Sequence, residues 1–510
     1  MPAEPIVDDT GHTIFSKMTT PTSPQRTPQA RLIAGAARVD VTPPVGMYHR
    51  MWGAAIHDRS TGVHRPLTAT ALWLQPRRES GSAGDAMLIL AIDHCILERA
   101  EMDRIRIAAG KATSIPAEQV HVCLSHTHAA GFMSRSRADL PGGDLIGPYL
   151  DELAVRAAEC AAGAQRLAKP ATLVATYGRC DLARHRDFYD VESKQFVCGF
   201  NPHGGGDDTL VVGRLTTDAT DGRPRSVIAT LVNYACHPTT LAWQNTLVSP
   251  DYVGLLRETI ENETGGAPCV FLQGASGDLG PREGFVGDVS VADRNGRQLG
   301  LAALSTLTTL PEAGTQFQYT GPVVSGATLG TWCHEPLNEQ ALNVAASWKH
   351  RAFTLPLGYK PELPTIAATR AELAKWNEEI RKAGEAQDEA RLSECRARAE
   401  RMTRQLAKLS LLPPGTMFPY TATLARTGGI LWVFAPGELY QVLQVELRRR
   451  FPEFAVVVAT ICDDWQPGYL PISATYGRGI YQEQIAVVAA GSLEALIERT
   501  ALELQTLTQA

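Results

Sequence analysis

Short apolar runs that end in polar loops recur along this chain, and they limit its fold more than any other feature. Four clear cases are TATALWLQP (68–76), AMLILAIDHCIL (86–97), SVIATLVNYACHPTTL (226–241) and APCVFLQGASGDLG (267–280). Helical spacing occurs between such runs, as in DELAVRAAECAAGAQRL at 151–167. Repeated strand–loop–helix units predict an α/β protein with a mixed β-sheet core flanked by helices. Functional residues are then expected in the loops at the strand ends.

Composition sets the ends of this predicted domain. Residues 1–29 are rich in Pro, Thr and Ser and lack a basic segment followed by an apolar core. They therefore predict a disordered leader rather than a signal peptide. No internal repeat and no linker interrupts residues 30–510, which we expect to form one large domain.

A segment rich in Ala, Glu, Arg and Lys, residues 369–412, differs from the rest of that domain. Its apolar residues are spaced by three and four positions, with a break after Gly384, which predicts an antiparallel helical hairpin inserted into the α/β domain. Two hypotheses remain open for its role. The hairpin is either a peripheral decoration with a solvated face, or a lid or homo-oligomer arm that limits the group admitted to a pocket.

Charge and apolar content exclude several classes of protein. A net charge of −6 over 510 residues leaves no concentrated basic face, so we expect no nucleic-acid partner. No stretch approaches the roughly 18 apolar residues that span a bilayer, so no transmembrane segment is expected. Ten cysteines, scattered and never in CxxC spacing, indicate reduced and mostly buried thiols, which favours a cytoplasmic location.

Two histidines one residue apart follow an apolar run in HVCLSHTHAAG (121–131). Residues 122–124 predict a strand that runs into a loop, and residues i and i+2 of a strand point to the same side. His126 and His128 are therefore expected to face one spot. They do so either as metal ligands or as two hydrogen-bonded imidazoles at a strand end.

Further candidate ligands follow other predicted strands. His237 comes after the apolar run 229–232, and Glu438 after the run 430–434 and a Pro-Gly pair, where it is expected to open a helix. Catalytic zinc sites use about three or four side chains of His, Glu, Asp or Cys. Taken singly, His237 is an ordinary loop histidine and Glu438 an ordinary partner of a helix N-terminus. Other hydrolase templates fit poorly, because the sequence lacks HExxH, HxHxDH and G-x-S-x-G.

Seven motifs then occur in order along nearly the whole chain. They are GAARVDV…TATALWL (35–74), SHTH (125–128), NYACHPTT (233–240), SPDYVG (249–254), FLQGASGDLGP (271–281), APGEL (435–439) and GYLPISATYGRGIY (468–481). Together they resemble the neutral/alkaline non-lysosomal ceramidases, zinc-dependent amidases that hydrolyse N-acylsphingosine. The resemblance implies a ceramidase-like catalytic domain over residues 30–510. The chain shows neither the secretion signal nor the C-terminal β-sandwich domain of that family, so we expect a divergent member.

The resemblance also implies a metal site. Matched residue by residue, it gives a zinc ion bound by His126, His237, Glu438 and Tyr469. The tyrosine ligand comes from matching the GY pair at 468–469, and spacing alone does not suggest it. The second histidine of the HxH pair, His128, matches the acid/base residue of the family.

Three further positions are implied to act on the substrate. Tyr481 matches a second functional tyrosine, which with an arginine is expected to stabilise the oxyanion. The arginine falls in CDLARHRDF (180–188), where we favour Arg186 and keep Arg184 as the alternative. Ser276 matches a pocket serine of the family, although a turn residue is the ordinary interpretation of a serine there.

These residues imply a zinc-dependent hydrolase that cleaves the amide bond of an N-acylated substrate by means of a metal-activated water. The substrate is expected to be either a ceramide-like lipid or another N-acyl small molecule. Two alternatives remain open. One is hydrolysis of a lipid or carbohydrate ester, which passes through the same tetrahedral intermediate. The other is a non-catalytic paralogue that binds its ligand without turning it over.

Overall fold

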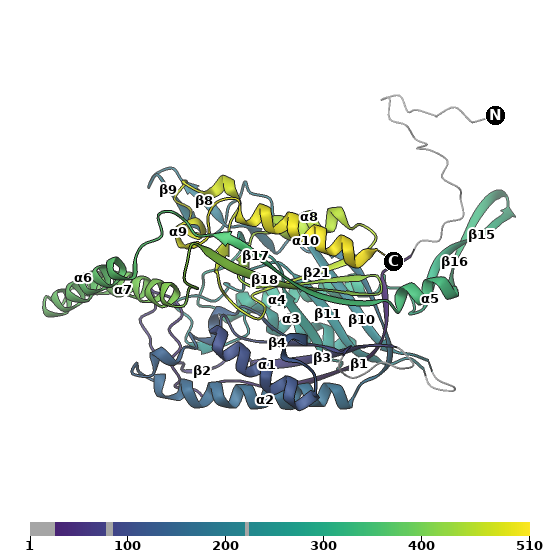
Figure 1. The fold of residues 1–510 in the computed structure, drawn as a ribbon, viewed down its shortest axis with the longest axis horizontal. Helices are drawn as coiled ribbons and strands as arrows, with labels where there is room; N and C mark the ends of the chain where they lie inside the picture. The colour runs from purple at the N-terminus through teal and green to yellow at the C-terminus, as the bar shows by residue number, and fades with distance from the viewer. Residues whose placement is uncertain (1–25, 78–84, 220–223, 510) are drawn as a thin grey trace, which may run out of the picture.

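An eight-stranded mixed sheet lies at the centre of the molecule, which a computed structural model describes for residues 26–77, 85–219 and 224–509 (Figure 1). Its strands are β1 (Gln29–Asp40), β3 (Thr68–Pro76), β4 (Met87–Ile92), β5 (Val120–Leu124), β6 (Lys169–Arg179), β10 (Thr209–Thr217), β11 (Val227–Tyr234) and β13 (Cys269–Gln273). They lie in the order β13-β11-β10-β6-β1-β3-β4-β5. The inner neighbours pair antiparallel, whereas the outermost pairs, β11 with β13 and β4 with β5, are parallel.

A four-stranded sheet packs against one face of the central sheet. It consists of β17 (Trp348–Gly358), β18 (Met417–Thr427), β19 (Ile430–Ala435) and β21 (Ala455–Thr460), in that order. Every second residue of β1 from Ala30 to Ala36 is buried in the core between the sheets, together with Trp432 and Phe434 of β19. Because successive side chains of a strand point to opposite faces, β1 can also support the helices on its other side.

Helices cover the two outer faces, which gives four layers (Figure 1). The central sheet carries α1 (Arg99–Thr113), α2 (Ile146–Arg166), α3 (Tyr252–Glu263) and α4 (Val289–Leu307), and the smaller sheet carries α8 (Val442–Arg450) and α10 (Ser492–Thr508). In α2 the buried stripe has helical spacing, with Leu150, Leu153, Ala157, Ala161 and Ala164 in the core. The predicted α/β class, a mixed sheet flanked by helices, is confirmed.

Two hairpins project from opposite ends of the molecule (Figure 1). One is the antiparallel pair α6 (Ile366–Glu385) and α7 (Glu389–Ser410), inserted between β17 and β18. Its helices begin where the side chains of Thr365 and Asp388 accept hydrogen bonds from backbone N–H groups of the first turn. The hairpin predicted for 369–412 is therefore present. The other projection is formed by β15 (Thr315–Ser325) and β16 (Ala327–Pro336), followed by α5 (Glu339–Ala345).

Short elements shape the loops between these layers. They are β2 (Gly62–Val63), β7 (Ala183–His185), β8 (Asp187–Asp190), β9 (Gln195–Cys198), β12 (Leu247–Val248), β14 (Leu279–Pro281), β20 (Glu438–Leu439), β22 (Tyr469–Leu470) and α9 (Tyr481–Ile485). The expectation that Glu438 opens a helix is wrong. Glu438 lies in β20, which pairs with β22, and α8 begins only at Val442.

The described fold starts slightly before the predicted domain boundary at residue 30. The side chain of Gln29, in β1, bonds to Gly314 N and Thr315 O at 2.7 Å each. Residues 1–25 of the predicted leader lie outside the described residues. Within the described ranges, no helix has the length and apolar character needed to cross a membrane. All ten cysteines are free thiols and most of them are buried, as the sequence predicts.

Candidate metal centre

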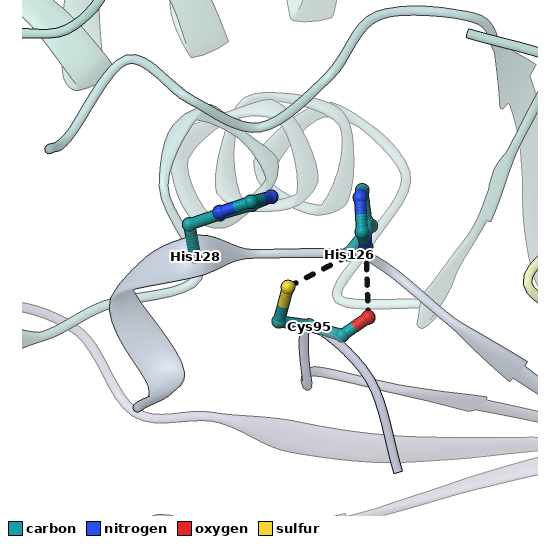
Figure 2. A group of neighbouring side chains, drawn as sticks. All are labelled: Cys95, His126 and His128. Atoms are coloured by element: carbon teal, nitrogen blue, oxygen red, sulfur yellow. Dashed lines mark hydrogen bonds between the residues drawn. The ribbon is translucent and has the colours of Figure 1, made fainter. Parts of the chain in front are cut away.

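Two histidine nitrogens face each other at the ends of two distant strands. His126 follows β5 and His237 follows β11, and their Nε2 atoms lie 3.0 Å apart. Each Nδ1 lies 2.8 Å from a backbone carbonyl, that of Cys95 for His126 and that of Ser276 for His237. Figure 2 shows the His126 ring over Cys95, with His128 rising from the same side of the segment. Since a carbonyl only accepts, both Nδ1 atoms carry a proton, so the Nε2 lone pair of each ring is free for a metal ion when that ring is neutral.

A carboxylate and a phenol complete this arrangement. The parallel pairing of β20 with β22 sets Glu438 beside Tyr469. Glu438 Oε2 lies 3.1 Å from His237 Nε2 and 3.3 Å from His126 Nε2. The Tyr469 hydroxyl lies 3.3 Å from His237 Nε2. Four acceptor atoms thus converge on one point.

The spacing of these atoms fits a small cation. Zinc bonds to nitrogen and oxygen of about 2.0–2.2 Å, arranged tetrahedrally, separate neighbouring ligand atoms by roughly 3.3 Å. The observed separations of 3.0–3.3 Å are close to that value. Two imidazole lone pairs in contact repel each other unless a positive charge lies between them. The donor set of two nitrogens and two oxygens therefore fits zinc.

Close backbone packing holds the Glu438 segment in place. Gly277 N donates to Leu439 O at 2.7 Å, and a Cβ on Gly277 would lie 2.6 Å from Glu438 O. Only glycine permits this approach. Asp278 Oδ1 accepts from Gln441 N at 2.8 Å and fixes the next part of the same loop. The loop after β13 therefore positions Glu438, which lies more than 150 residues after Gly277 in the sequence.

His128 faces the same point as His126, but the expected reason is wrong. The strand ends at Leu124, His126 has a left-handed backbone with φ 69°, and His128 begins a single 3₁₀ turn. A turn, rather than strand alternation, brings the two ring centroids to 4.8 Å. Trp52 stacks on His128 with ring centroids 5.0 Å apart, and His128 Nε2 has no hydrogen-bond partner among the described groups.

Burial keeps the His128 imidazole neutral. Burial lowers the pKa of His128 well below its usual value, and the neighbouring His126 and His237 lower it further. A neutral ring with a free nitrogen can accept a proton from a water in the pocket. His128 therefore has the chemistry predicted for it, and its role remains a prediction.

The other implied residues lie at different depths. Tyr481, the first residue of α9, has its ring centroid 6.0 Å from that of Tyr469. Arg186 is buried and donates from Nη2 to the Tyr469 hydroxyl at 2.9 Å and to Gly277 O at 2.7 Å. Burial raises the pKa of the Tyr469 hydroxyl, whereas the Arg186 charge lowers it. Arg186 therefore forms a direct hydrogen bond to Tyr469, one of the implied metal ligands.

Two implied substrate contacts do not reach the pocket. Ser276 Oγ accepts from Gln273 Nε2 at 2.6 Å, and its carbonyl orients His237. Arg184 Nη2 bonds to Asp181 at 3.0 Å, with a partly exposed side chain. Of the two arginines considered, Arg186 is the one that lies at the metal centre, while Arg184 lies away from it.

A cavity of about 360 Å³ opens beside the metal centre. Five of the implied residues line it: His126, His128, Glu438, Tyr469 and Tyr481. Apolar side chains, among them Trp52, Phe132 and Trp465, supply much of the remaining surface. Another part of the wall comes from α7, through Glu400, Arg404 and Lys408.

A hairpin that reaches the pocket is one of the two hypotheses that the sequence leaves open, but the sequence does not identify the α7 residues in the cavity wall, because a solvated face is the ordinary interpretation of their charges. Their spacing was nevertheless informative, because positions 400, 404 and 408 lie four apart and share one side of a helix. Trp52 and Cys95 also line the cavity, and no motif spacing distinguishes them from core residues.

Two further groups of potential ligands occur in the described part of the chain. His121, Cys462 and Asp463 lie close together, but His121 Nδ1 is 3.0 Å from Asp463 and its Nε2 is 3.3 Å from His350 Nε2. This group is a satisfied hydrogen-bond network. Cys95 also lies near His126 and His128, but His126 Nδ1 is already bonded to the Cys95 carbonyl.

Comparison with known proteins supports the fold alone. No protein-family model matches the chain, and no curated protein matches it significantly in sequence. Neutral ceramidase from Pseudomonas aeruginosa aligns with a TM-score of 0.58 and 15% identity, over 94% of this chain and 75% of that protein. A ceramidase complexed with C2 aligns with a TM-score of 0.60 and 15% identity, over 94% and 76%. The chain has a ceramidase-like fold.

Proposed function

We propose that this chain is a zinc-dependent hydrolase that cleaves the amide bond of an N-acylated substrate. The observation that carries the proposal is the contact between His126 Nε2 and His237 Nε2, two acceptor atoms 3.0 Å apart beside Glu438 and the Tyr469 hydroxyl. Two neutral rings hold this arrangement only with a cation between the two Nε2 atoms, either a shared proton or a metal ion, and the added carboxylate and phenol oxygens favour the metal ion. The fold is similar to that of ceramidases, and this analogy also favours amide hydrolysis.

The residues around this centre suit water attack on a carbonyl. A zinc ion bound there would lower the pKa of a water towards neutrality and polarise the scissile carbonyl. His128, neutral and with a free Nε2, takes the proton of the attacking water. The hydroxyl oxygen bonds to the acyl carbon, the C–N bond breaks, and His128 returns the proton to the departing nitrogen.

Two tyrosines have separate tasks in this proposal. Tyr481 lines the cavity and offers its hydroxyl to the developing oxyanion. Tyr469 is a ligand, and Arg186 supports it by donating to its oxygen at 2.9 Å. This assignment differs from the expectation that Arg186 touches substrate, because Arg186 is buried behind Tyr469.

The lining of the cavity favours an acyl substrate with an apolar part. Trp52, Phe132 and Trp465 offer contact area to a hydrocarbon chain. A ceramide-like lipid and a smaller N-acyl compound both satisfy this requirement. An ester would enter the same site, so substrate class has to be measured.

The deciding experiment is a hydrolysis screen of matched N-acyl and O-acyl compounds of several chain lengths. It is run on the purified protein, on protein stripped by a chelator, and after zinc is restored, with elemental analysis of each sample. Amide cleavage that follows zinc content supports the proposal. Ester cleavage alone would replace it with the esterase, and binding without turnover would indicate a non-catalytic paralogue. Full activity in metal-free protein would refute the zinc centre.

A further inference from the structure

The inserted helix α7 brings positive charge to the cavity. Four cationic side chains, Arg137, Arg401, Arg404 and Lys408, line it, against the three acidic side chains Glu98, Glu400 and Glu438. Three of the four cations are on α7. A divalent cation at the metal centre would add to this excess. A partly enclosed cavity with positive charge favours an anionic ligand.

Two of these cations share one carboxylate, that of Glu400. Arg137 donates from both Nη atoms to the two oxygens of Glu400, at 2.8 and 2.9 Å. Arg404 Nε donates to Glu400 Oε1 at 2.6 Å, and its Nη2 donates to Met51 O. Both guanidinium groups also lie over the ring of Phe132, at 5.0 and 4.8 Å. The cluster of Arg137, Arg404, Glu400 and Phe132 holds α7 against the domain.

Lys408 is different. Its Nζ donates to the Ile485 carbonyl, and no carboxylate lies within 4.0 Å of it among the described residues. An ammonium group has three N–H donors, so two remain without a protein acceptor in the described structure. Burial lowers the pKa of Lys408 to about 8, against the opposing charge of Glu438, so the group is still a cation at pH 7. A half-buried cation without an acidic partner is costly unless a ligand supplies one.

Arg401 is a weaker candidate for the same task. Its Nη2 donates to the neutral Gln484 Oε1 at 3.0 Å, and the residue is exposed. An exposed guanidinium remains hydrated and needs no partner. Among these four cations, Lys408 is therefore the one that is partly buried and has no carboxylate partner in the described structure.

Building on the proposed hydrolase function, we propose that the substrate carries an anionic group and that Lys408 binds it. An amide with this chemistry is an N-acyl amino acid, in which a carboxylate lies next to the scissile bond. Lysine acts as a point charge and also accepts a phosphate-type anion, so the two anions have to be compared directly. A neutral N-acyl lipid offers Lys408 oxygen acceptors but no counter-charge.

The test compares three probes that share one acyl chain. They are N-decanoylglycine, its neutral carboxamide N-decanoylglycinamide, and N-decanoylaminomethylphosphonate. Release of decanoate by the zinc-loaded full chain gives kcat/KM for each probe. We expect the wild-type protein to prefer the carboxylate to the carboxamide. Lys408→Met should reduce that preference by about 10- to 100-fold, as loss of a charged hydrogen bond does.

Controls separate binding of an anion from a structural role. Lys408→Arg should restore part of the preference, because it keeps the charge. Lys382→Met, on the exposed surface of α6, should leave the preference unchanged. If Lys408 serves only to tie α7 to Ile485, Lys408→Met lowers both rates together and the ratio stays constant, which overturns the proposal. A wild-type preference for the carboxamide overturns it as well. A phosphonate that behaves as the carboxylate does supports the same lysine–anion pair.

The proposal can fail separately from the hydrolase function. Cleavage of the neutral probe by a zinc-dependent protein with no preference for an anion would leave the hydrolase intact and remove the role of Lys408. If no probe is cleaved, calorimetric Kd values for decanoylglycine and its carboxamide still decide the matter. Weaker binding of the carboxylate to Lys408→Met, relative to the carboxamide, supports the anion site without turnover. Equal Kd values for both proteins exclude it.

Discussion

The cavity has two differently built sides, the metal centre and the α7 face. The candidate metal centre collects His126, His237 and Glu438 from positions 111 and 201 residues apart. Each of the three is fixed by a hydrogen bond to a backbone carbonyl of another loop. The α7 face comes from one helix, through residues spaced by four. A centre assembled from distant loops depends on the whole fold, whereas the residues of one inserted helix can change with less effect on the rest of the fold, apart from those that anchor it. We infer that the first side sets the chemistry and the second sets the substrate.

The most severe test of the metal centre is removal of one histidine ligand. His126→Ala or His237→Ala removes one of the four proposed zinc ligands, so we expect loss of bound zinc and a fall of activity to background. Elemental analysis and a hydrolysis assay on the same sample measure both effects. His203→Ala, at an exposed position away from the cavity, is the matched control and should keep metal and rate. Retention of zinc in both ligand variants would break the assignment of this side.

A smaller effect is expected from the second histidine of the pair. His128→Ala leaves all four proposed ligands in place, so most of the metal should remain. Turnover should fall by roughly 10²–10⁴, the usual range for a general acid/base. Single-turnover kinetics with zinc-loaded protein provide the measurement. Loss of zinc in this variant would instead make His128 a ligand and would favour the alternative group with Cys95.

Substitution of Tyr469 and of Tyr481 separates metal binding from oxyanion stabilisation at the metal centre. Tyr469→Phe removes a ligand oxygen and leaves Gly277 O as the remaining acceptor of Arg186, so we expect weaker zinc retention in a chelator titration. Tyr481→Phe should keep the metal and lower kcat by about 10²–10³, as loss of one oxyanion donor does. Identical zinc affinities in the two variants would mean that Tyr469 does not bind the metal.

Much of the metal centre could be anticipated from sequence because strand ends are visible there. The apolar run before His237 became β11, the run before Glu438 became β19, and the seven ordered motifs led to the ceramidase-like fold that the structural comparison supports. Local backbone geometry was less accessible. His126 adopts a left-handed conformation and Glu438 a two-residue strand, and neither follows from an apolar pattern.

The sequence leaves open whether the hairpin reaches the pocket, and it does not identify the residues of the α7 face that line it. The apolar residues of the hairpin have helical spacing, and the predicted bounds 369–412 lie within a few residues of the observed ones. The packing of that hairpin against Arg137, more than 250 residues earlier in the chain, depends on a tertiary ion pair. A single sequence contains no record of such a contact, so charged residues were assigned to solvent by default.

The smallest expected effects concern how α7 is held, and two ion pairs of the same hairpin test this directly. Glu400 bonds to Arg137 and Arg404, and the Glu400 and Arg137 side chains are only 9% and 8% exposed. Glu400→Gln leaves the buried Arg137 and the partly exposed Arg404 without a counter-charge, so the free energy of unfolding should fall by about 3 kcal/mol in urea titrations. Zinc content should not change, because no proposed ligand is altered.

Arg381 on α6 also bonds to two glutamates, Glu378 and Glu385, but it is largely exposed. Arg381→Gln should therefore leave the urea midpoint unchanged within error, since exposed pairs are hydrated and screened. Equal midpoints for the two variants would show that α7 is not anchored through Glu400. The α7 face would then be a mobile cover rather than a fixed wall of the pocket.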